Sequence, residues 1–491
     1  MTREADGETR RIGDTILELS SVCVGALVNR AQGFTAADAT RYIWFLVAAA
    51  YVLVMAASAS VLSWDIWPAF VIVPVLGAVT LPLVRRGLRK DPDPLIGRIV
   101  IVAFVAKMLG SMARYALTYG LYDAGDAEGY HLSGSRLAAA FWDGTYAQVV
   151  QVEVPDLTGT PFINLVTGLL YIITEPTKLG GFLIFAWFSF IGLFCFYKAV
   201  VVGFPAANHR GYAYLVFFLP SMLYWPSSIG KDAWICFGLG LSSYGIALIM
   251  RHQPLGYPVA GLGLLATAGA RPHITVLVVV SLMMAYLLRR KSWREATFGP
   301  VGKMVGVVVL MGVGVLVVGK AASYFDVDEV SGGSVTEVLD TTDQRTAQGG
   351  SEFEAVRVKS PTEFPNAVLA VLFRPWPWEA GNAQTLIAAA EGVMLLVLGA
   401  AATTRLLRLP RYIFQVPYVA YALTYTVMFV IAFSSIANFG ILTRQRTQVL
   451  PLVLVMLVLP METNRVEEAA PTLEKRARQL ARSPSRPGPR S

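Results

Sequence analysis

Long apolar stretches follow one another along almost the whole chain, and short polar segments separate them. A helix needs roughly 20 apolar residues to cross the hydrocarbon core of a bilayer, and somewhat fewer where its polar ends reach the interface. The pattern therefore predicts an all-α, polytopic integral membrane protein with about twelve transmembrane helices. The predicted spans cover residues 43–63, 66–84, 99–119, 182–202, 211–226, 232–250, 256–270, 273–288, 300–319, 383–403, 413–433 and 447–460.

The composition favours a membrane protein over a nucleic-acid-binding protein. Of the 491 residues, 55% are hydrophobic and 15% are charged, and the mean hydropathy is +0.54, whereas soluble domains average roughly 25% charged residues. Much of the net charge of +8 lies in short loops and in a tail from Glu474 to Ser491, so membrane topology explains it without a nucleic acid. Cys23, Cys195 and Cys236 show no paired spacing, which predicts neither a disulfide framework nor a zinc site.

Lys and Arg are concentrated in three short loops, residues 85–98, 289–294 and 405–411. Cytoplasmic loops of membrane proteins carry an excess of these residues. We therefore expect a multi-pass protein of the plasma (inner) membrane with both termini in the cytoplasm and no cleavable signal peptide. The predicted organisation is a cytoplasmic amphipathic segment at 1–40, a transmembrane domain at 41–460 and a basic, disordered cytoplasmic tail at 461–491.

The basic loops share one side of the membrane only if an even number of spans separates them. Residues 161–174, a short apolar stretch, are therefore predicted to form an interfacial or re-entrant helix on the outer face. Five segments then face outward, and they hold the unusual polar clusters of the sequence. They are the outer loop 120–181, the corners 226–232 and 270–273, the outer loop 320–382, whose residues 320–360 are predicted to be mobile, and the loop 434–446.

The first cluster is Gly-Asp-Ala-Glu-Gly-Tyr-His at residues 125–131. Asp126, Glu128 and His131 offer two carboxylates and an imidazole, which suit a catalytic general base or the binding of a divalent metal. Tyr130 is a candidate ring for stacking against a sugar. The alternative is a solvated loop in which Asp126 only caps a helix.

Two corners carry further cations. Residues 220–232 end in Ser-Ser-Ile-Gly-Lys-Asp, a turn that can place free backbone N–H groups and Lys231 at a helix start, where anions bind. Lys231 and Asp232 are alternatively a membrane-edge anchor and its counter-ion. The next corner is Arg271-Pro272-His273, which adds Arg271 and His273 to the candidate phosphate-binding residues.

The last two clusters contain arginines. Trp376 and Trp378 alone are ordinary residues of a membrane interface, but beside Arg374 they suit a sugar face or a lipid phosphate, because guanidinium binds phosphate in a bidentate way. Arg444 and Arg446 lie in an outward loop, against the usual bias of positive charge toward the cytoplasm, which favours an anionic ligand there. A lipid-headgroup contact or a structural ion pair is the alternative.

These residue types suit transfer from a phosphorylated lipid, because a carboxylate can deprotonate an acceptor hydroxyl while cations stabilise the leaving phosphate. In layout, most of residues 97–460 resembles the C-type (GT-C) membrane glycosyltransferases and the polysaccharide polymerases of bacterial exopolysaccharide clusters. The acidic motif around Asp126 carries the first likeness. The segments Phe-Leu-Pro-Ser…Gly-Lys-Asp and Asn-Phe-Gly…Arg-Gln-Arg carry the second.

The resemblance implies a GT-C-like fold and a glycosyltransferase or polymerase for cell-envelope or exopolysaccharide synthesis. Its donor would be a polyprenyl-phosphate- or polyprenyl-pyrophosphate-linked sugar, and its acceptor a glycan or a lipid-linked glycan at the outer face. By this likeness Asp126 is the base or a metal ligand, with Glu128 as its neighbour. A divalent cation, Mg²⁺ or Mn²⁺, is left open as a cofactor.

Two other functions remain open. A transporter or flippase of lipid-linked oligosaccharide would line a membrane path with the same cations, and Lys107, Arg114 and Lys303 place charge inside predicted spans. A structural scaffold of a polysaccharide-export complex would need none of the clusters. An enzyme requires the outer clusters to converge on one pocket, whereas a transporter requires a polar path through the core.

Overall fold

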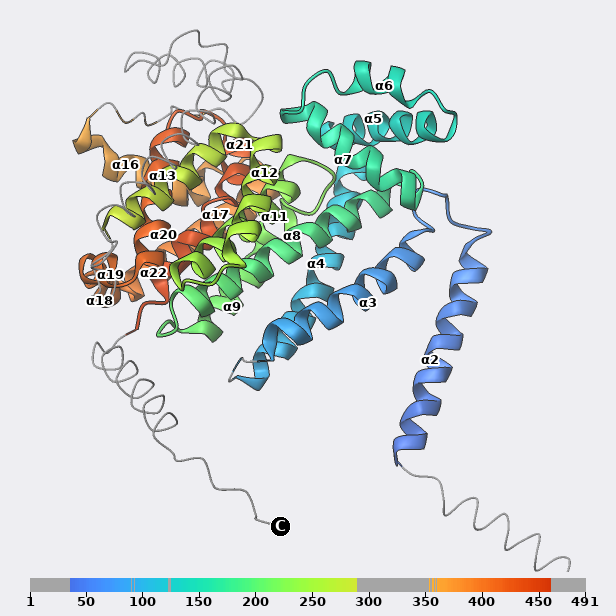
Figure 1. The fold of residues 1–491 in the computed structure, drawn as a ribbon, viewed down its shortest axis with the longest axis horizontal. Coiled ribbons are helices and arrows are strands. Elements are labelled where there is room, and N and C mark those ends of the chain that lie inside the picture. The colour runs from blue at the N-terminus through green and yellow to red at the C-terminus, as the bar shows by residue number, and fades with distance from the viewer. Residues whose placement is uncertain are drawn as a thin grey trace, which may run out of the picture. The chain divides into compact units, whose positions relative to one another are not determined.

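The computed structural model describes residues 36–89, 91, 93–121, 125–288, 353, 356, 358 and 360–460. Every regular element in these ranges is a helix (Figure 1), in agreement with the predicted all-α class. The chain divides into two units, Met1–Phe70 and Val71–Ser491. The first apolar helix belongs to the smaller unit, and the boundary at residue 40 between a cytoplasmic segment and the transmembrane domain stays a prediction.

The smaller unit contains helix α2 (Ala36–Ser58). The helix ends before the predicted limit at residue 63, and the hydroxyls of Ser58 and Ser60 donate to carbonyl oxygens of its last turn, which a helix end leaves without backbone partners. Trp67 donates to the carbonyl of Met55 at 2.9 Å, so the segment after the helix folds back onto it. Residues 1–35 of the predicted cytoplasmic segment lie outside the described residues.

Six described helices are long and apolar enough to cross a membrane, which indicates a membrane-embedded protein. A seventh span is present if α19 (Leu409–Gln415) and α20 (Pro417–Phe433), which meet at a 119° bend, count as one. The six are α2 from Thr40 onward, α3 (Ala69–Leu88), α4 (Pro94–Gly120), α8 (Lys178–Gly203), α11 (Lys231–Met250) and α17 (Ala383–Ala401).

Twelve spans are not confirmed, because several of the predicted stretches form shorter helices. Prolines explain two of the interruptions, since the residue before a proline avoids the helical conformation. Leu219 (ψ 130°) precedes Pro220, and Val416 (ψ 98°) precedes Pro417. The predicted span 300–319 lies outside the described residues. The shorter helices are α9 (His209–Phe218) with α10 (Pro220–Tyr224), α12 (Gly256–Ala270), α13 (Pro272–Leu288) and α22 (Leu450–Leu457).

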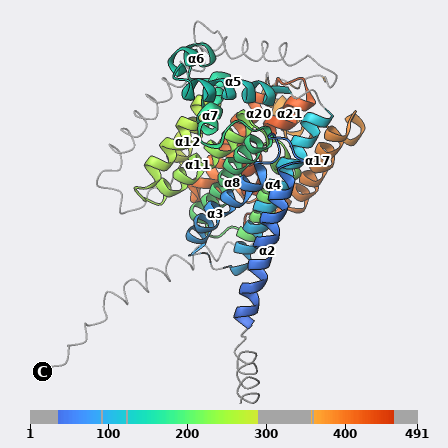
Figure 2. The same cartoon turned by 90° about the vertical axis from the view of Figure 1, so that its right-hand side faces the viewer.

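Residues 125–181 are mostly helical, whereas the sequence predicted a helix only at 161–174 within the outer loop 120–181. Small residues bring two of its helices together: a Cβ on Gly134 would lie 2.5 Å from the Thr167 side chain, and one on Gly168 would lie 2.7 Å from Leu137. The helices are α5 (Gly125–Trp142), α6 (Tyr146–Glu153) and α7 (Gly159–Thr174). Figures 1 and 2 show α5 and α6 at one end of the bundle, which we call the α5 end.

Helix α7 does not cross the bundle, in agreement with the prediction for residues 161–174. Near its start, Phe162 packs against Gly269 in the last turn of α12. Near its end, Tyr171 donates to the carbonyl of Thr177, directly before α8. Because α12 ends and α8 begins at the α5 end, both ends of α7 lie there.

The opposite end of the bundle, which we call the basic end, holds the loops 85–98 and 405–411. Several of its cations bind neighbouring segments. Arg210 pairs with Asp93 at 2.7 Å, and Lys198 donates to the carbonyl of Gly87 at 2.6 Å. Arg251 donates to the carbonyl of Val202 at 2.9 Å, and Arg405 to that of Leu457 at 3.1 Å. The third basic loop, 289–294, lies outside the described residues. The two sets of loops thus occupy opposite ends, and the cytoplasmic side of the basic end remains a prediction.

The tightest helix contact joins α8 and α11. A Cβ on Gly240 would lie 2.1 Å from the carbonyl oxygen of Gly192, and one on Gly192 would lie 2.3 Å from that of Cys236. Small residues at a crossing let membrane helices approach and gain van der Waals contact. This crossing therefore holds α11, whose first turn carries Lys231 and Asp232, against the centre of the bundle.

Substituting Gly240 by Ala is expected to destabilise the fold by about 1–3 kcal/mol, the usual cost of overpacking, because a backbone carbonyl cannot move out of the way. Gly261→Ala is the matched control, since nothing lies within 4 Å of its Cβ position and both changes replace a helical glycine. Thermal unfolding in detergent measures the difference. Equal melting temperatures for the two variants would contradict the close crossing.

Single cysteines introduced at Thr404 and Gln253 of the basic end are expected to react with a membrane-impermeant maleimide only after the cells are opened. A cysteine at Thr145, between α5 and α6, is expected to react in intact cells. All three positions are exposed, so accessibility follows sidedness. The background lacks the three native cysteines, and the reverse labelling pattern would refute a cytoplasmic basic end.

Candidate functional site

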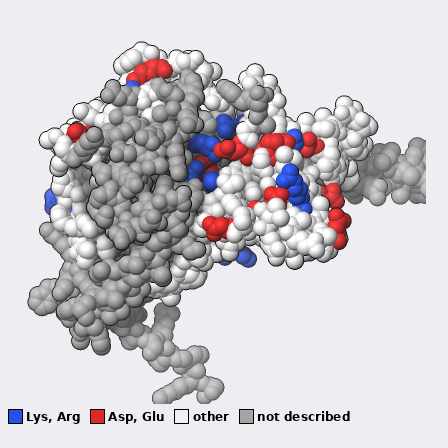
Figure 3. Space-filling model, turned by 90° about the horizontal axis from the view of Figure 1, so that it is seen from above, with Lys and Arg blue, Asp and Glu red and all other residues white. Residues whose placement is uncertain are grey.

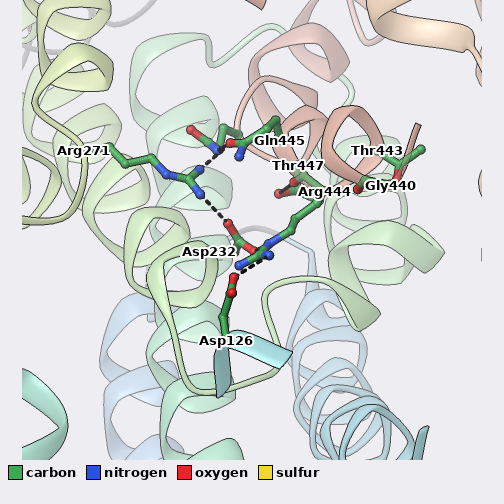
Figure 4. A network of polar contacts seen from close by, with 9 residues as sticks. Asp126, Asp232, Arg271, Gly440, Thr443, Arg444, Gln445 and Thr447 are labelled. Atoms are coloured by element: carbon green, nitrogen blue, oxygen red, sulfur yellow. Dashed lines mark hydrogen bonds and ion pairs between the residues drawn. The ribbon is translucent and has the colours of Figure 1, made fainter. Parts of the chain in front are cut away.

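A buried carboxylate, Asp232, lies at the centre of a polar network at the α5 end (Figure 4). Its side chain is 5% exposed and accepts hydrogen bonds from Arg271, at 3.0 Å, and from Arg444. Arg271 also donates to Gln445, and Arg444 reaches Asp126 at 3.0 Å. The network thus joins side chains from α5, α11, α21 (Phe439–Arg446) and the corner before α13.

Local backbone geometry positions Asp232 and Arg271. Gly230 precedes α11 with φ 145°, a conformation that favours glycine, and a Cβ there would lie 3.1 Å from the ring of Tyr130. Asp232 then lies in the first turn of α11, where free N–H groups favour negative charge. Arg271 follows α12 in an extended conformation, because Pro272 prevents the helix from continuing through it.

Helix α21 sends its two arginines to different places. Residues two apart on a helix do not face each other. Arg444 enters the network, whereas Arg446 is fully buried and donates to the carbonyls of Leu372 and Arg374 at 2.9 and 3.0 Å. Arg446 is therefore next to the network in sequence but outside it in space.

The charge of Arg444 is stabilised by its carboxylate partners. The Asp232 carboxylate, with a smaller contribution from Asp126, raises the pKa of the Arg444 guanidinium above its usual value. The two pairs differ in exposure, since Asp232 is buried while the Asp126 side chain is 64% exposed. The first pair is therefore structural, and the second is open to exchange with water or a ligand.

Lys231 lies directly beside this network at the start of α11. It is half-buried, and the charges of Asp126, Arg271 and Arg444 act on it. It makes no hydrogen bond or ion pair with any residue that the structure describes. Its ammonium group is therefore available to a ligand.

A cavity of about 240 Å³ opens beside Asp126 and Arg444. Arg114 of α4 contributes to its wall, with the guanidinium stacked over the rings of Tyr224 and Trp225 at 4.5 and 4.8 Å. The Nε of Arg114 is buried and has no hydrogen-bond partner among the described residues. The lining residues are Arg114, Thr118, Gly125, Asp126, Ala127, Trp225, Ser228, Ile229, Gln384 and Arg444.

The region around the cavity carries an excess of positive charge. Four cations, Arg114, Lys231, Arg271 and Arg444, face two carboxylates, Asp126 and Asp232, which leaves a net formal charge of +2. Figure 3 looks onto this end of the molecule and shows Lys, Arg, Asp and Glu side chains gathered together there. An anion with several oxygens, such as a phosphate, fits this arrangement, because guanidinium groups bind it through paired N–H donors.

The structure separates the three polar residues of the 125–131 cluster. Glu128 accepts from Tyr119 at 2.7 Å and from Lys178 at 3.0 Å. Burial alone would raise the pKa of Glu128, but these two partners outweigh it and lower the pKa below its usual value, which makes Glu128 a poor proton acceptor. His131 is buried, with Nδ1 2.8 Å from the Tyr171 hydroxyl.

Asp126, Glu128 and His131 therefore have separate partners and do not form a set of metal ligands. Within the described residues, no group of three or more His, Cys, Asp or Glu side chains is arranged to hold a metal ion. Mg²⁺ or Mn²⁺ stays open as a cofactor, and Asp126 alone of the three lines the cavity.

Two other predicted site residues pack against neighbouring residues, Tyr130 buried and His273 partly buried. Tyr130 is 4% exposed and packs against Gly230, and its burial raises the pKa of the phenol to about 12. Its ring therefore has no open face for a sugar in this conformation. His273 follows Pro272 in α13 and packs beside Phe433, with ring centroids 6.3 Å apart.

Arg374 and the two tryptophans form a separate patch. Arg374 binds Glu379 through two nitrogens, at 3.0 and 2.5 Å, so its charge is already paired. Trp376 and Trp378 stack with centroids 5.8 Å apart, and Trp378 is 80% exposed. This patch keeps an open aromatic surface, but none of its three residues lines the cavity or pairs with Asp232.

The sequence did not single out the aromatic and amide part of the cavity wall. Trp225 and Gln384 carry no charge and lie in or near apolar stretches, and Ser228 enters the sequence prediction only as part of the corner 226–232. Arg114 stood out only as a charge inside a span. The nearby Tyr224-Trp225-Pro226 run was a usable signal, because two rings before a helix break provide a stacking surface for a guanidinium.

No protein-family model, curated protein or solved structure matches this chain. The function is therefore argued from the site itself.

Asp232→Asn is expected to destabilise the protein by about 3–5 kcal/mol, because it leaves Arg271 and Arg444 near each other without the buried carboxylate that compensates them. Asp143→Asn, at an exposed position beyond α5, is the matched control. Denaturation in detergent measures both. An Asp232→Asn protein as stable as the control would show that the network does not hold these segments together.

Proposed function

We propose that the protein is a membrane glycosyltransferase or polysaccharide polymerase that uses a polyprenyl-phosphate- or polyprenyl-pyrophosphate-linked sugar. The observation that carries the proposal is the convergence of Asp126, Arg114 and Arg444 on one cavity at the α5 end of an apolar helical bundle. The charges of Asp126 and Arg444 also act on Lys231. These side chains come from segments far apart in the sequence. Their convergence is what the enzyme hypothesis requires.

The charge of the site supports an anionic donor. Arg114 and Lys231 have donor atoms that no described residue uses, and Arg444 has one exchangeable partner in Asp126. Together they suit a phosphate or pyrophosphate group. A cavity of about 240 Å³ is below the roughly 300–1,000 Å³ typical of pockets for drug-sized ligands, so it suits the headgroup, while the polyprenyl tail stays in the bilayer.

The proposed reaction is an acid–base-assisted substitution at the anomeric carbon of the donor sugar. Asp126 removes the proton from an acceptor hydroxyl, and that oxygen forms a bond to the anomeric carbon. The bond between this carbon and the phosphate oxygen breaks, and its electron pair leaves with the polyprenyl (pyro)phosphate. Arg114, Lys231 and Arg444 stabilise the negative charge on the leaving group.

The exposed Trp376 and Trp378 supply a surface for a longer glycan. Stacked indole rings suit the apolar face of a sugar. Arg446 of α21, the helix that also carries Arg444, donates to the carbonyl of Arg374 beside these rings. In the proposal this patch contacts the acceptor glycan outside the cavity. The plasma membrane, with the α5 end on its outer side, is the proposed location.

A flippase or transporter of lipid-linked oligosaccharide is the second candidate. The observation that favours it is charge buried within candidate spans, at Lys107 of α4 and Glu391 of α17. Intramembrane charges often mark a transport path. The same cations of the cavity would then bind a lipid phosphate in transit.

Purified protein tested with a panel of polyprenyl-phosphate and polyprenyl-pyrophosphate sugars is expected to transfer sugar, and Asp126→Asn is expected to lower kcat by about 10²–10⁴-fold, the contribution of a general base. Asp143→Asn, which removes an exposed carboxylate from the same region, should keep full activity. Equal turnover by wild type and Asp126→Asn would remove Asp126 as the base. Lipid movement across proteoliposomes without any sugar transfer would favour the flippase.

A further inference from the structure

The span that the sequence predicts at residues 211–226 is broken into two short helices, α9 and α10, and a turn follows before α11. Helix α9 ends at Phe218, α10 covers only Pro220–Tyr224, and α11 begins at Lys231. A break inside an apolar bundle leaves backbone N–H and C=O groups without helical partners. Each costs several kcal/mol in hydrocarbon unless another group satisfies it.

Glu391 satisfies the first of these groups. Its Oε2 accepts a hydrogen bond from the backbone N–H of Ser221, in the first turn of α10, at 2.7 Å. Glu391 is 3% exposed and belongs to α17, which is 170 residues away in the sequence. A carboxylate in this position suits the free N–H groups of a helix start.

Lys107 satisfies a second backbone group of the same short helix, α10. Its Nζ donates to the carbonyl of Met222 at 2.6 Å, and its side chain is fully buried in α4. One turn further along α4, Ser111 donates to the carbonyl of Ser227 at 3.0 Å. Gly110 between them lets α4 approach, since a Cβ there would lie 2.6 Å from the Leu223 carbonyl oxygen.

The held segment forms one wall of the cavity. Trp225, Ser228 and Ile229 lie directly after α10 and line the cavity. Two further contacts fasten the same wall: Arg114 stacks on Tyr224 and Trp225, and Gln384 donates to the Tyr224 hydroxyl at 2.6 Å. The fastening residues again come from α4 and α17. The two helices thus hold the break from both sides.

We propose that Lys107 and Glu391 are positioning residues, which clamp the broken span so that its corner, residues 219–230, forms the wall of the donor site. Their charges satisfy backbone groups of α10 instead of lining a path for a transported ion or lipid. The role in catalysis rests on the proposed glycosyl transfer, whereas the clamp itself does not. Loss of either side chain frees the corner to move.

The choice of variants separates a clamp from a transport path. Glu391→Gln keeps an oxygen that accepts from the Ser221 N–H, while Glu391→Leu and Lys107→Met remove the hydrogen bonds. If the charges carry ions or protons along a path, all three variants lose transport. If they act as a clamp, Glu391→Gln keeps its hydrogen bond and its function. Lys198→Met is the matched control, because Lys198 also donates to a carbonyl, that of Gly87 at 2.6 Å, but at the basic end.

The measurement is the rate at which a maleimide labels a cysteine placed at Ser228, in detergent, with the native cysteines replaced. We expect labelling to be about tenfold faster or more in Lys107→Met and Glu391→Leu, because an unpaired buried group favours opening of the corner. Glu391→Gln and Lys198→Met are expected to stay within about twofold of the parent. In the transfer assay, the two clamp-removing variants should raise the KM for the donor more than they lower kcat.

Unchanged labelling in well-folded Lys107→Met and Glu391→Leu proteins would overturn the proposal, as would Glu391→Gln labelling as fast as Glu391→Leu. If Glu391→Leu does not fold, the comparison of Lys107→Met with Lys107→Arg still decides, since only the Arg variant keeps a donor for the Met222 carbonyl and is expected to label at the parent rate. Labelling needs no turnover. If the protein transfers no sugar but shows these labelling rates, the proposed glycosyl transfer is contradicted and the clamp is still supported.

Discussion

The position of the site depends on one buried carboxylate held between two guanidinium groups. Asp232 alone would be costly to bury, and Arg271 and Arg444 would repel each other without it. The three are stable only together, which fixes the start of α11, the corner before α13 and the end of α21 at one place. Asp126 of α5 joins them through its ion pair with Arg444. The contact between α5 and the network therefore depends on the position of Arg444.

A second constraint, the need to satisfy backbone groups inside an apolar bundle, decides which charges remain for a ligand. Lys107 and Glu391 are used by the broken span, and their charge is not available to the cavity. Arg114 is held by aromatic rings instead, which support the guanidinium without occupying its N–H groups. Lys231 has no hydrogen-bonded partner among the described residues. Buried charge in this protein therefore has two uses, one structural and one open to binding.

The apolar pattern located the helices well but not their lengths. It could not show that Val416 and Leu219 interrupt two stretches, because the effect of a following proline is local, whereas the pattern averages over a span. It singled out Asp126 and Arg444, whose charge was unusual for their place in the chain. It treated Arg444 and Arg446 alike, although the turn of α21 separates them. The two arginines differ only in their tertiary contacts, which the local sequence does not reveal.

The two ion pairs of Arg444 differ in a way that bears on the proposed reaction. Its contact with Asp232 is buried, so breaking it would strand a charge in a low dielectric, while its contact with Asp126 is exposed and weak. An anionic headgroup that enters the cavity therefore competes with Asp126 and not with Asp232. Once Arg444 turns to the headgroup, the Asp126 carboxylate is released from its ion pair and can accept a hydrogen bond from an acceptor hydroxyl. Donor binding would thus prepare the base beside it.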